Sequence, residues 1–152
     1  MKAVTYLAAF TLAASAVVST AFAKAPEGWE TEVKAALEIA KKENKAVMLE
    51  FTGSDWCPPC KMMAKNVFSK DEFLKKASEK FVLVHLDFPQ GDEELAKKNE
   101  PYSEEYKIDA FPTIVLLDSD GKEFDRFTAS TYGDVEKFLA KLDESLENKD
   151  LD

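Results

Sequence analysis

The two cysteines of this 152-residue chain lie three positions apart, in the segment Trp56-Cys57-Pro58-Pro59-Cys60-Lys61. Thiols at this spacing can form a disulfide, exchange disulfides with a partner, or contribute two ligands to a metal. The apolar run before them, residues 46–51, predicts a buried strand, and the residues after Cys57 predict a helix. The pair is therefore expected where a helix begins.

The start of a helix is a position that activates a thiol. Free N–H groups and the helix dipole stabilise negative charge there, which favours the thiolate form of Cys57. Pro58 suits the first helical position because its missing N–H would have no partner there in any case. Since Pro58 and Pro59 both lack an N–H, few backbone donors can point at the Cys57 sulfur, and we expect moderate activation.

Three roles for the cysteine pair compete. As a structural staple, a loop of four residues would contribute only about 2 kcal/mol, and a chain of this length can bury a core without one. As a zinc site, the pair lacks two ligands, and the only further soft candidate is His85. As a redox pair, the Cys57 thiolate attacks a partner disulfide and Cys60 resolves the mixed disulfide. Redox exchange is favoured, with no metal and no organic cofactor expected.

Two further residues could move protons. Glu50 is an acid inside the apolar run 46–51, and burying a carboxylate is costly enough to favour its protonated form, so that it exchanges protons near neutral pH. The alternative, a position at a solvated rim, stays open. His85 lies in a second apolar run, 81–87, and is expected to be a hydrogen-bonded sheet residue rather than a ligand or base.

Strand and helix patterns alternate along the rest of the chain. Strands are predicted at 46–51, 81–87, 113–117 and 123–127, the last after a hairpin turn at 118–121. Helices are predicted at 31–43, 57–67, 71–80, 93–98 and 103–107, with Pro101 separating the last two, and a closing helix carries the stripe Val135, Phe138, Leu139, Leu142 and Leu146. This order predicts an α/β fold with a mixed central sheet and helices on both faces.

The first 23 residues have the pattern of a cleaved secretory signal peptide. Lys2 precedes an uncharged stretch, and Ala21-Phe22-Ala23 is a small-x-small cleavage site. A retained membrane anchor is less favoured, because Ser and Thr interrupt the stretch and a spanning helix needs about 20 strongly apolar residues. We therefore expect a single domain at 24–152, periplasmic or secreted, with no stable membrane insertion after cleavage.

The charge balance argues against some partners. The chain has 29 Asp and Glu against 20 Lys and Arg, a formal net charge of −9. Phosphate backbones and anionic lipid surfaces repel such a chain. Nucleic-acid binding is therefore not expected.

Three segments together carry a resemblance to a known family. The strand Val47 to Phe51, the Trp-Cys-Pro-Pro-Cys-Lys motif, and Phe111-Pro112-Thr113 before an apolar strand resemble the thioredoxin-like superfamily. The similarity is greatest to exported proteins like the C-terminal domain of the bacterial transmembrane thiol-disulfide reductant, and it spans about residues 45–142. The resemblance implies a thioredoxin-like fold, protein clients with disulfides or dithiols, and a redox partner that recycles the protein.

The resemblance also implies roles for individual residues. Pro112 would be cis and pack against the disulfide, and Phe111 would pair through its backbone with an extended client. From the residues alone, a trans proline that opens an edge strand stays possible. The expected client contacts are Trp56, Pro58, Pro59, Phe111 and Pro112.

Glu50 would serve as proton acceptor for Cys60. This chain departs from the thioredoxin pattern there, with Glu in place of Asp and a connection to Trp56 that is one residue longer.

The sequence thus predicts an exported thiol-disulfide oxidoreductase with Cys57, Cys60 and Glu50 in its catalytic site, acting as a reductase. The alternative from another class is a non-catalytic thioredoxin-like binding module whose disulfide stays closed, since a fold alone does not establish a function.

Overall fold

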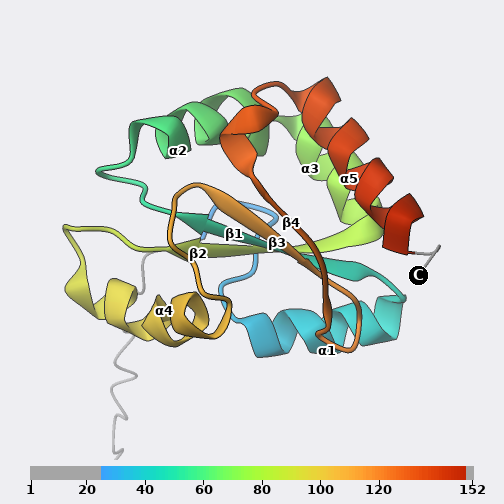
Figure 1. The fold of residues 1–152 in the computed structure, drawn as a ribbon, viewed down its shortest axis with the longest axis horizontal. Helices are drawn as coiled ribbons and strands as arrows, with labels where there is room; N and C mark the ends of the chain where they lie inside the picture. Colours follow the sequence, from blue (N-terminus) through green and yellow to red (C-terminus); the bar gives the residue numbers. More distant parts are fainter. Residues whose placement is uncertain (1–24, 150–152) are drawn as a thin grey trace, which may run out of the picture.

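A computed structural model describes residues 25–149, so the predicted signal peptide lies outside the described residues. At its centre is a four-stranded sheet of order β2-β1-β3-β4 (Figure 1). β1 (Ala46–Thr52) pairs parallel to β2 (Phe81–Asp87) and antiparallel to β3 (Thr113–Leu117). β4 (Glu123–Thr128) pairs antiparallel to β3 and forms the outer strand. The mixed sheet predicted from the sequence is confirmed.

Helices cover both faces of the sheet (Figure 1). One face carries α2 (Pro58–Met63), α3 (Asp71–Lys80) and α5 (Val135–Lys149), and the opposite face carries α1 (Val33–Glu43) and α4 (Glu93–Glu105). A π-helical segment, η1 (Ala64–Phe68), continues α2, and a 3-10 turn, η2 (Ala129–Thr131), follows β4. Within the described residues, no helix is both long and apolar enough to cross a bilayer.

The sheet separates two apolar layers. Every residue of β1 is buried, as expected for a strand with neighbours on both edges and helices on both faces. On the α1 side, β1 contributes Val47, Leu49 and Phe51. On the α2 side it contributes Met48, and because side chains alternate along a strand, Glu50 points the same way. This alternation directs an acidic side chain toward the helix that carries the cysteines.

Two expected helices differ in the structure. The segments 93–98 and 103–107, predicted as separate, form one helix that runs through Pro101. Packing holds α4 to the sheet, because the buried Asn99 side chain donates to the Asp87 carbonyl oxygen at 2.8 Å. The predicted helix 57–67 is α-helical only to Met63 and then widens into η1, where Val67 and Phe68 are both buried.

The segment before α1 adds a short strand-like contact that the sequence patterns did not predict. Glu30 bridges to Val84, with its N–H donating to the Leu83 carbonyl and its carbonyl accepting from the His85 N–H. Trp29, beside it, packs against Phe68 and Phe73. This segment covers part of the free edge of β2 and one side of His85.

Candidate active site

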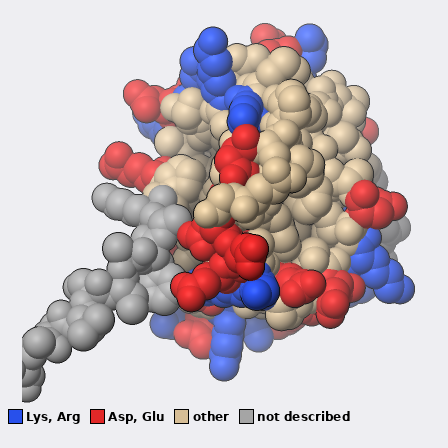
Figure 2. All heavy atoms as spheres, turned by 90° about the vertical axis from the view of Figure 1, so that its left-hand side faces the viewer, with Lys and Arg blue, Asp and Glu red and all other residues tan. Residues whose placement is uncertain are grey.

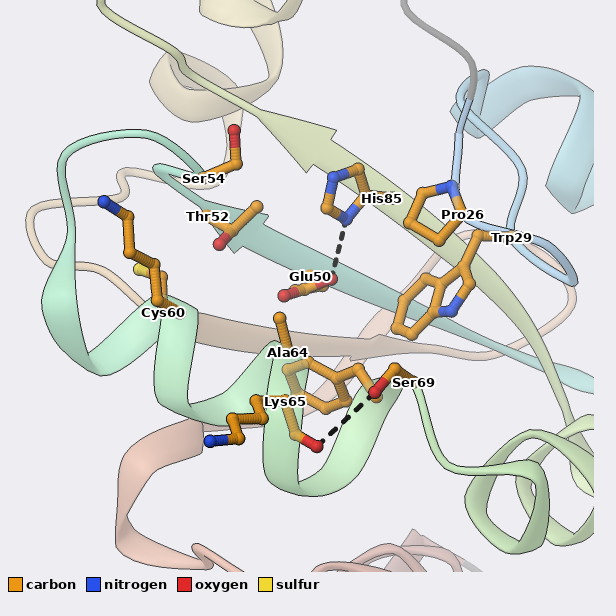
Figure 3. Close-up of a pocket in the computed structure, with 12 residues that line it drawn as sticks. Pro26, Trp29, Glu50, Thr52, Ser54, Cys60, Ala64, Lys65, Ser69 and His85 are labelled. Carbon is orange, nitrogen blue, oxygen red and sulfur yellow. Dashed lines mark hydrogen bonds and ion pairs between the residues drawn. The ribbon is translucent and has the colours of Figure 1, made fainter.

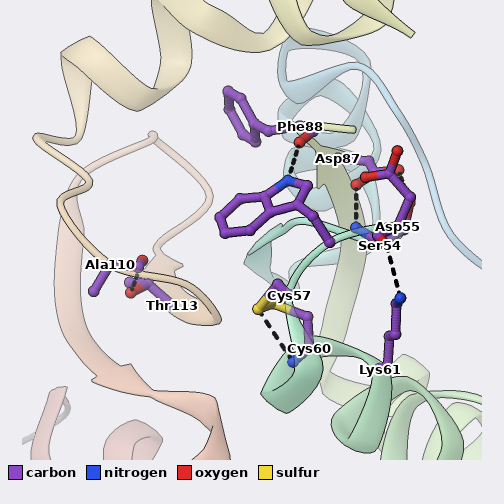
Figure 4. The surroundings of a disulfide bond; sticks show 10 residues. Ser54, Asp55, Cys57, Cys60, Lys61, Asp87, Phe88, Ala110 and Thr113 are labelled. Atoms are coloured by element: carbon purple, nitrogen blue, oxygen red, sulfur yellow. Dashed lines mark hydrogen bonds between the residues drawn. A yellow bond between two sulfur atoms is a disulfide. The ribbon is translucent and has the colours of Figure 1, made fainter. Parts of the chain in front are cut away.

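The cysteine pair lies where the sequence predicted it, between β1 and α2. Cys57 and Cys60 form a disulfide with an S–S distance of 2.08 Å (Figure 4). Cys57 is the N-cap of α2, and its sulfur accepts a hydrogen bond from the Cys60 N–H at 3.3 Å. Pro58 and Pro59 occupy the first helical positions, where no donor is lost. The Cys57 sulfur therefore sits in the positive field of a helix N-terminus.

The loop between β1 and Cys57 is fastened to the end of β2. The Asp87 carboxylate accepts from the backbone and hydroxyl of Ser54, at 2.9 and 2.5 Å. The Asp55 carboxylate accepts from the N–H groups of Gln90 and Gly91, and these bonds lower the pKa of Asp55. These contacts fix the approach of the chain to the cysteines.

Two charged side chains fasten this loop further. Asp55 binds the β2–α4 loop, and the helix cap is Cys57. The Lys61 ammonium donates to the Asp55 carbonyl at 2.7 Å. Both side chains close the loop around the motif.

Trp56 joins the motif to two neighbouring loops. Its indole N–H donates to the Phe88 carbonyl at 2.7 Å, and its ring meets Phe111 edge to face at 5.6 Å. The indole also lies so close to Gly53 that a Cβ there would be 2.4 Å from it. Trp56 nevertheless remains 39% exposed.

Pro112 follows a cis peptide bond, as the resemblance implies, and the trans alternative is wrong. The Pro112 carbonyl accepts from the Ala129 N–H, and the Thr113 hydroxyl donates to the Ala110 carbonyl (Figure 4). Through the contact of Phe111 with Trp56, this loop reaches the cysteine motif. Two of the three segments that carry the resemblance, the cysteine motif and the cis-proline loop, are thus brought together.

The surface of this side of the molecule is unevenly charged. Figure 2 shows the face that carries the β1–α2 and β2–α4 connections, with a broad uncharged area at its upper right and acidic side chains gathered near the middle and along the lower side. Both cysteines are buried, Cys57 at 3% and Cys60 at 1% exposure. Met62, one turn into α2, is exposed, whereas Met63 packs in the core.

Glu50 is buried and pairs with His85. The two residues face each other in the β1–β2 register, and His85 Nδ1 lies 2.8 Å from Glu50 Oε2. An imidazolium carries a hydrogen on both ring nitrogens, so protonated His85 donates to Glu50 through Nδ1. Burial lowers the pKa of His85, but the hydrogen bond and charge of Glu50, together with Asp87, outweigh it and raise the pKa above its usual value. His85 is thus the hydrogen-bonded sheet residue predicted, and the solvated-rim alternative for Glu50 is wrong.

A cavity of about 400 Å³ connects this pair with the second cysteine (Figure 3). Glu50, His85 and Thr52 line it from the sheet, and Cys60 lines it from α2. Its remaining wall consists of side chains from the N-terminal segment, the loop before Cys57, α2, η1 and the residue after η1: Pro26, Trp29, Ser54, Lys61, Ala64, Lys65, Phe68 and Ser69. Glu50 and Cys60 therefore line the same cavity.

A model of the family described as a thioredoxin-like domain matches residues 33–145. The chain belongs to this thioredoxin-like family. The match covers every strand of the sheet, the cysteine motif and the cis-proline loop.

Among curated relatives of this thioredoxin-like chain is the disulfide bond reductase DsbH of Chlamydia pneumoniae, 38% identical over 101 residues. The match covers 64% of this chain and 60% of that relative. A solved DsbH oxidoreductase has 34% identity and a TM-score of 0.70, covering 78% of this chain and 83% of that one. The reduced DsbD C-terminal domain of Neisseria meningitidis has 26% identity and a TM-score of 0.55, covering 74% and 92%.

Two features of this thioredoxin-like site escaped sequence reasoning. The pairing of Glu50 with His85 depends on the β1–β2 register, which neither strand sequence specifies by itself. The wall formed by Pro26 and Trp29 comes from a segment without a periodic pattern. Among residues 25–149, no three His, Cys, Asp or Glu side chains converge in a way that could hold a metal ion.

Proposed function

We propose that this protein is an exported thiol-disulfide oxidoreductase that reduces disulfides in protein clients. The observation that carries the proposal is the Cys57–Cys60 disulfide at the N-terminus of α2, with the Cys57 sulfur accepting the Cys60 N–H. A helix N-terminus stabilises the thiolate that leaves when this bond opens, so the pair is suited to exchange.

The chemistry has two steps. The Cys57 thiolate attacks one sulfur of a client disulfide, forming a mixed disulfide and releasing the other client sulfur as a thiolate. Cys60 then gives its proton to Glu50 and attacks the Cys57 sulfur, releasing the second client thiolate. Two electrons pass to the client, the Cys57–Cys60 bond forms again, and a reduced redox partner must recycle it.

The direction toward reduction draws on similarity to known proteins. A curated relative is named a disulfide bond reductase, and the chain covers 60% of its length. The fold also matches the C-terminal domain of DsbD. Exchange itself is reversible, so the reduction potential decides the direction.

The client is proposed to bind across Trp56, Pro58, Pro59, Phe111 and Pro112. Pro58 and Trp56 are exposed, and the rings of Trp56 and Phe111 form an edge-to-face wall beside the motif. The uncharged area of this face suits an extended, apolar segment of the client (Figure 2).

Export rests on the signal-peptide pattern of residues 1–23. Mass spectrometry of the protein recovered from a Gram-negative host checks it, with Lys24 as the expected first residue.

The first test is the reduction potential of the Cys57–Cys60 pair, measured by equilibration in glutathione buffers and trapping of free thiols. For a reductase we expect a reduction potential close to that of thioredoxin, about −270 mV, whereas the potential of a strong oxidant such as DsbA is about −120 mV. A potential close to that of DsbA would overturn the proposed direction of electron flow toward the client. A pair that never equilibrates would instead support the binding-module alternative, which the burial of both cysteines makes worth testing.

The second test separates the roles of the two cysteines. Cys60→Ser is expected to accumulate a mixed disulfide with a disulfide-bonded peptide, because the resolving thiol is missing. Cys57→Ser is the matched control and should form almost none. Mass spectrometry after acid quenching measures the adduct. Equal adducts on the two variants would contradict the assignment of Cys57 as nucleophile.

A further inference from the structure

Met62 carries the sulfur atom that is most open to solvent in the described part of the chain. Among the methionines of residues 25–149, Met48 is fully buried, Met63 is 2% exposed and Met62 is 58% exposed. The two cysteines are joined in the disulfide and are themselves buried. A reagent dissolved in water therefore meets the Met62 thioether before it meets another sulfur of residues 25–149.

The helical period of α2 turns Met62 outward. Cys60 and Met63, three positions apart, are the buried residues of this helix and face the rest of the fold. Residues three and four positions apart lie on the same side of a helix, so Met62 follows Pro59 and Pro58 on the outward side. Pro58 is exposed and Pro59 is half-buried. Met62 therefore extends the surface that the two prolines present beside the cysteines.

The fold does not use the Met62 side chain. Neither apolar layer of the described residues includes it. Among residues 25–149, Trp56 and Met62 are the large apolar side chains that stay exposed, one on each side of the cysteine motif along the chain. Substitutions at exposed positions of this kind seldom change stability much, so variants of Met62 are expected to fold. A client that lies across the motif would cover this side chain.

The Met62 thioether can be oxidised by hydrogen peroxide. The O–O bond of the peroxide breaks, one oxygen bonds to the sulfur, and the other leaves as water with both hydrogens. The sulfur gives two electrons to the peroxide, and the methionine becomes methionine sulfoxide. A closed disulfide has no thiolate, which is the form of cysteine that peroxide attacks. In the disulfide form of the protein, Met62 is thus the sulfur most open to this reaction.

We propose that Met62 is an oxidation site through which peroxide weakens the binding of clients. The inference rests on the proposed function, since it needs a client that lies across Pro58 and Pro59. The sulfoxide is polar and replaces a flexible, apolar side chain. An apolar client segment that covers the S–O group removes water from it without offering a hydrogen bond, and this costs binding free energy. Methionine sulfoxide reductases reverse the change.

The first experiment locates the added oxygen. The protein in its disulfide form is treated with dilute hydrogen peroxide, catalase removes the excess, and tryptic peptides are fragmented in a mass spectrometer. We expect one added oxygen on Met62 and almost none on Met48 or Met63. Met63 is an internal control, because trypsin leaves it in the same peptide as Met62. Equal oxidation of Met62 and Met63 would overturn the inference, since exposure would then not select the site.

The second experiment measures the effect of the sulfoxide on the reduction of clients. A dithiol reopens the disulfide and leaves the sulfoxide in place, and rates are measured with insulin as the protein client and with Ellman's reagent as a small disulfide. We expect the KM for insulin to rise about threefold to tenfold at nearly constant kcat, because a contact made in the ground state and the transition state alike is weakened. Ellman's reagent is too small to cover α2, so its rate is expected to stay within about twofold of the untreated protein.

Two variants of Met62 isolate the sulfur. Met62→Leu is the matched control, because it keeps an apolar side chain of similar volume that peroxide cannot oxidise. Whatever its starting KM for insulin, peroxide is expected to leave that KM unchanged. Met62→Gln places a polar group at the same point and is expected to raise the KM without peroxide. Methionine sulfoxide reductases are expected to restore the KM of oxidised wild type.

Several outcomes would overturn the inference. An unchanged KM in oxidised wild type means that Met62 does not contact the client. An equal rise in wild type and Met62→Leu places the effect elsewhere, and an equal loss with insulin and Ellman's reagent places the damage at the cysteines or the fold. If the untreated protein exchanges with Ellman's reagent but does not reduce insulin, the proposed reduction of protein clients fails. The effect of the sulfoxide on client binding then fails with it, whereas the oxidation site itself is decided by the first experiment.

Discussion

The position of the Trp56 indole depends on the glycine at position 53, which has no side chain. Its indole occupies the space where any side chain on Gly53 would begin. In that place it donates to the Phe88 carbonyl and meets Phe111, so it links the loop before the cysteines to the β2–α4 loop and the cis-proline loop. Position 53 therefore has to be glycine, because the Trp56 ring lies too close to it for any side chain.

Gly53→Ala is expected to displace the Trp56 indole. The new Cβ would lie 2.4 Å from the indole, and the hydrogen bond to Phe88 would be lost, at a cost of about 1 kcal/mol in unfolding free energy. Urea denaturation measures the loss, and tryptophan fluorescence reports the displaced ring. Gly133→Ala, where the nearest atom is 3.9 Å away, is the control. Indistinguishable spectra for Gly53→Ala and wild type would contradict the expected clash.

The residues of the site were predictable to different degrees. The cysteine pair, the buried Glu50 and the cis peptide bond before Pro112 follow from local motifs and from resemblance. The partners of those residues do not, because the bonds of Asp55 with Gly91 and of Glu50 with His85 join segments about 35 positions apart. Only the folded sheet and its loops bring such segments together.

At the scale of elements, α5 is anchored by a cluster of aromatic rings. Phe138 is fully buried, and its ring centroid lies 5.2 Å from that of Phe68, 5.6 Å from Phe73 and 5.6 Å from Phe127. These rings belong to η1, α3 and β4, so a single residue of α5 contacts three other elements. The helix that closes the chain thereby supports the π-helical segment behind the cysteines.

Phe138→Ala is expected to lower the unfolding free energy by about 3 to 5 kcal/mol, because it leaves a cavity among rings that cannot fully collapse. Glu136→Ala, on the exposed side of the same helix, should stay within about 0.5 kcal/mol of wild type. Urea denaturation of both variants makes the comparison. Equal losses would mean that helix propensity, and not the aromatic cluster, governs the docking of α5.

Element boundaries were predictable where the apolar pattern is long and unbroken, as at β2 and β3, whose observed bounds equal the predicted ones. The pattern failed at Pro101, where packing of α4 on the sheet outweighs the missing N–H. It also failed at 64–68, where a π-helical segment buries both Val67 and Phe68. In both cases tertiary contacts determine the helix type and its end, which local sequence preference does not specify.

For the molecule as a whole, the buried Glu50–His85 pair links stability to pH. The pKa of His85 is raised in the folded state, so the stabilising effect of its protonation is fully present below the unfolded value of about 6.5 and is lost as the pH rises through the folded value. We therefore expect the stability difference between wild type and His85→Gln to be largest in mildly acidic solution and to shrink above neutral pH. Urea midpoints over this range measure it, and a difference that grows with pH would contradict the prediction.

Both outer strands of the sheet are protected against the addition of a foreign strand, each in its own way. On β2, Glu30 already occupies backbone groups of Leu83 and His85. On β4, the charged residues Glu123, Asp125 and Arg126 discourage another chain from pairing. The protein can therefore expose an apolar surface around its disulfide without offering a sheet edge for aggregation. Loss of the segment around Glu30 would open the cavity beside His85. It would also expose the edge of β2, whose unpaired backbone groups could then pair with another chain.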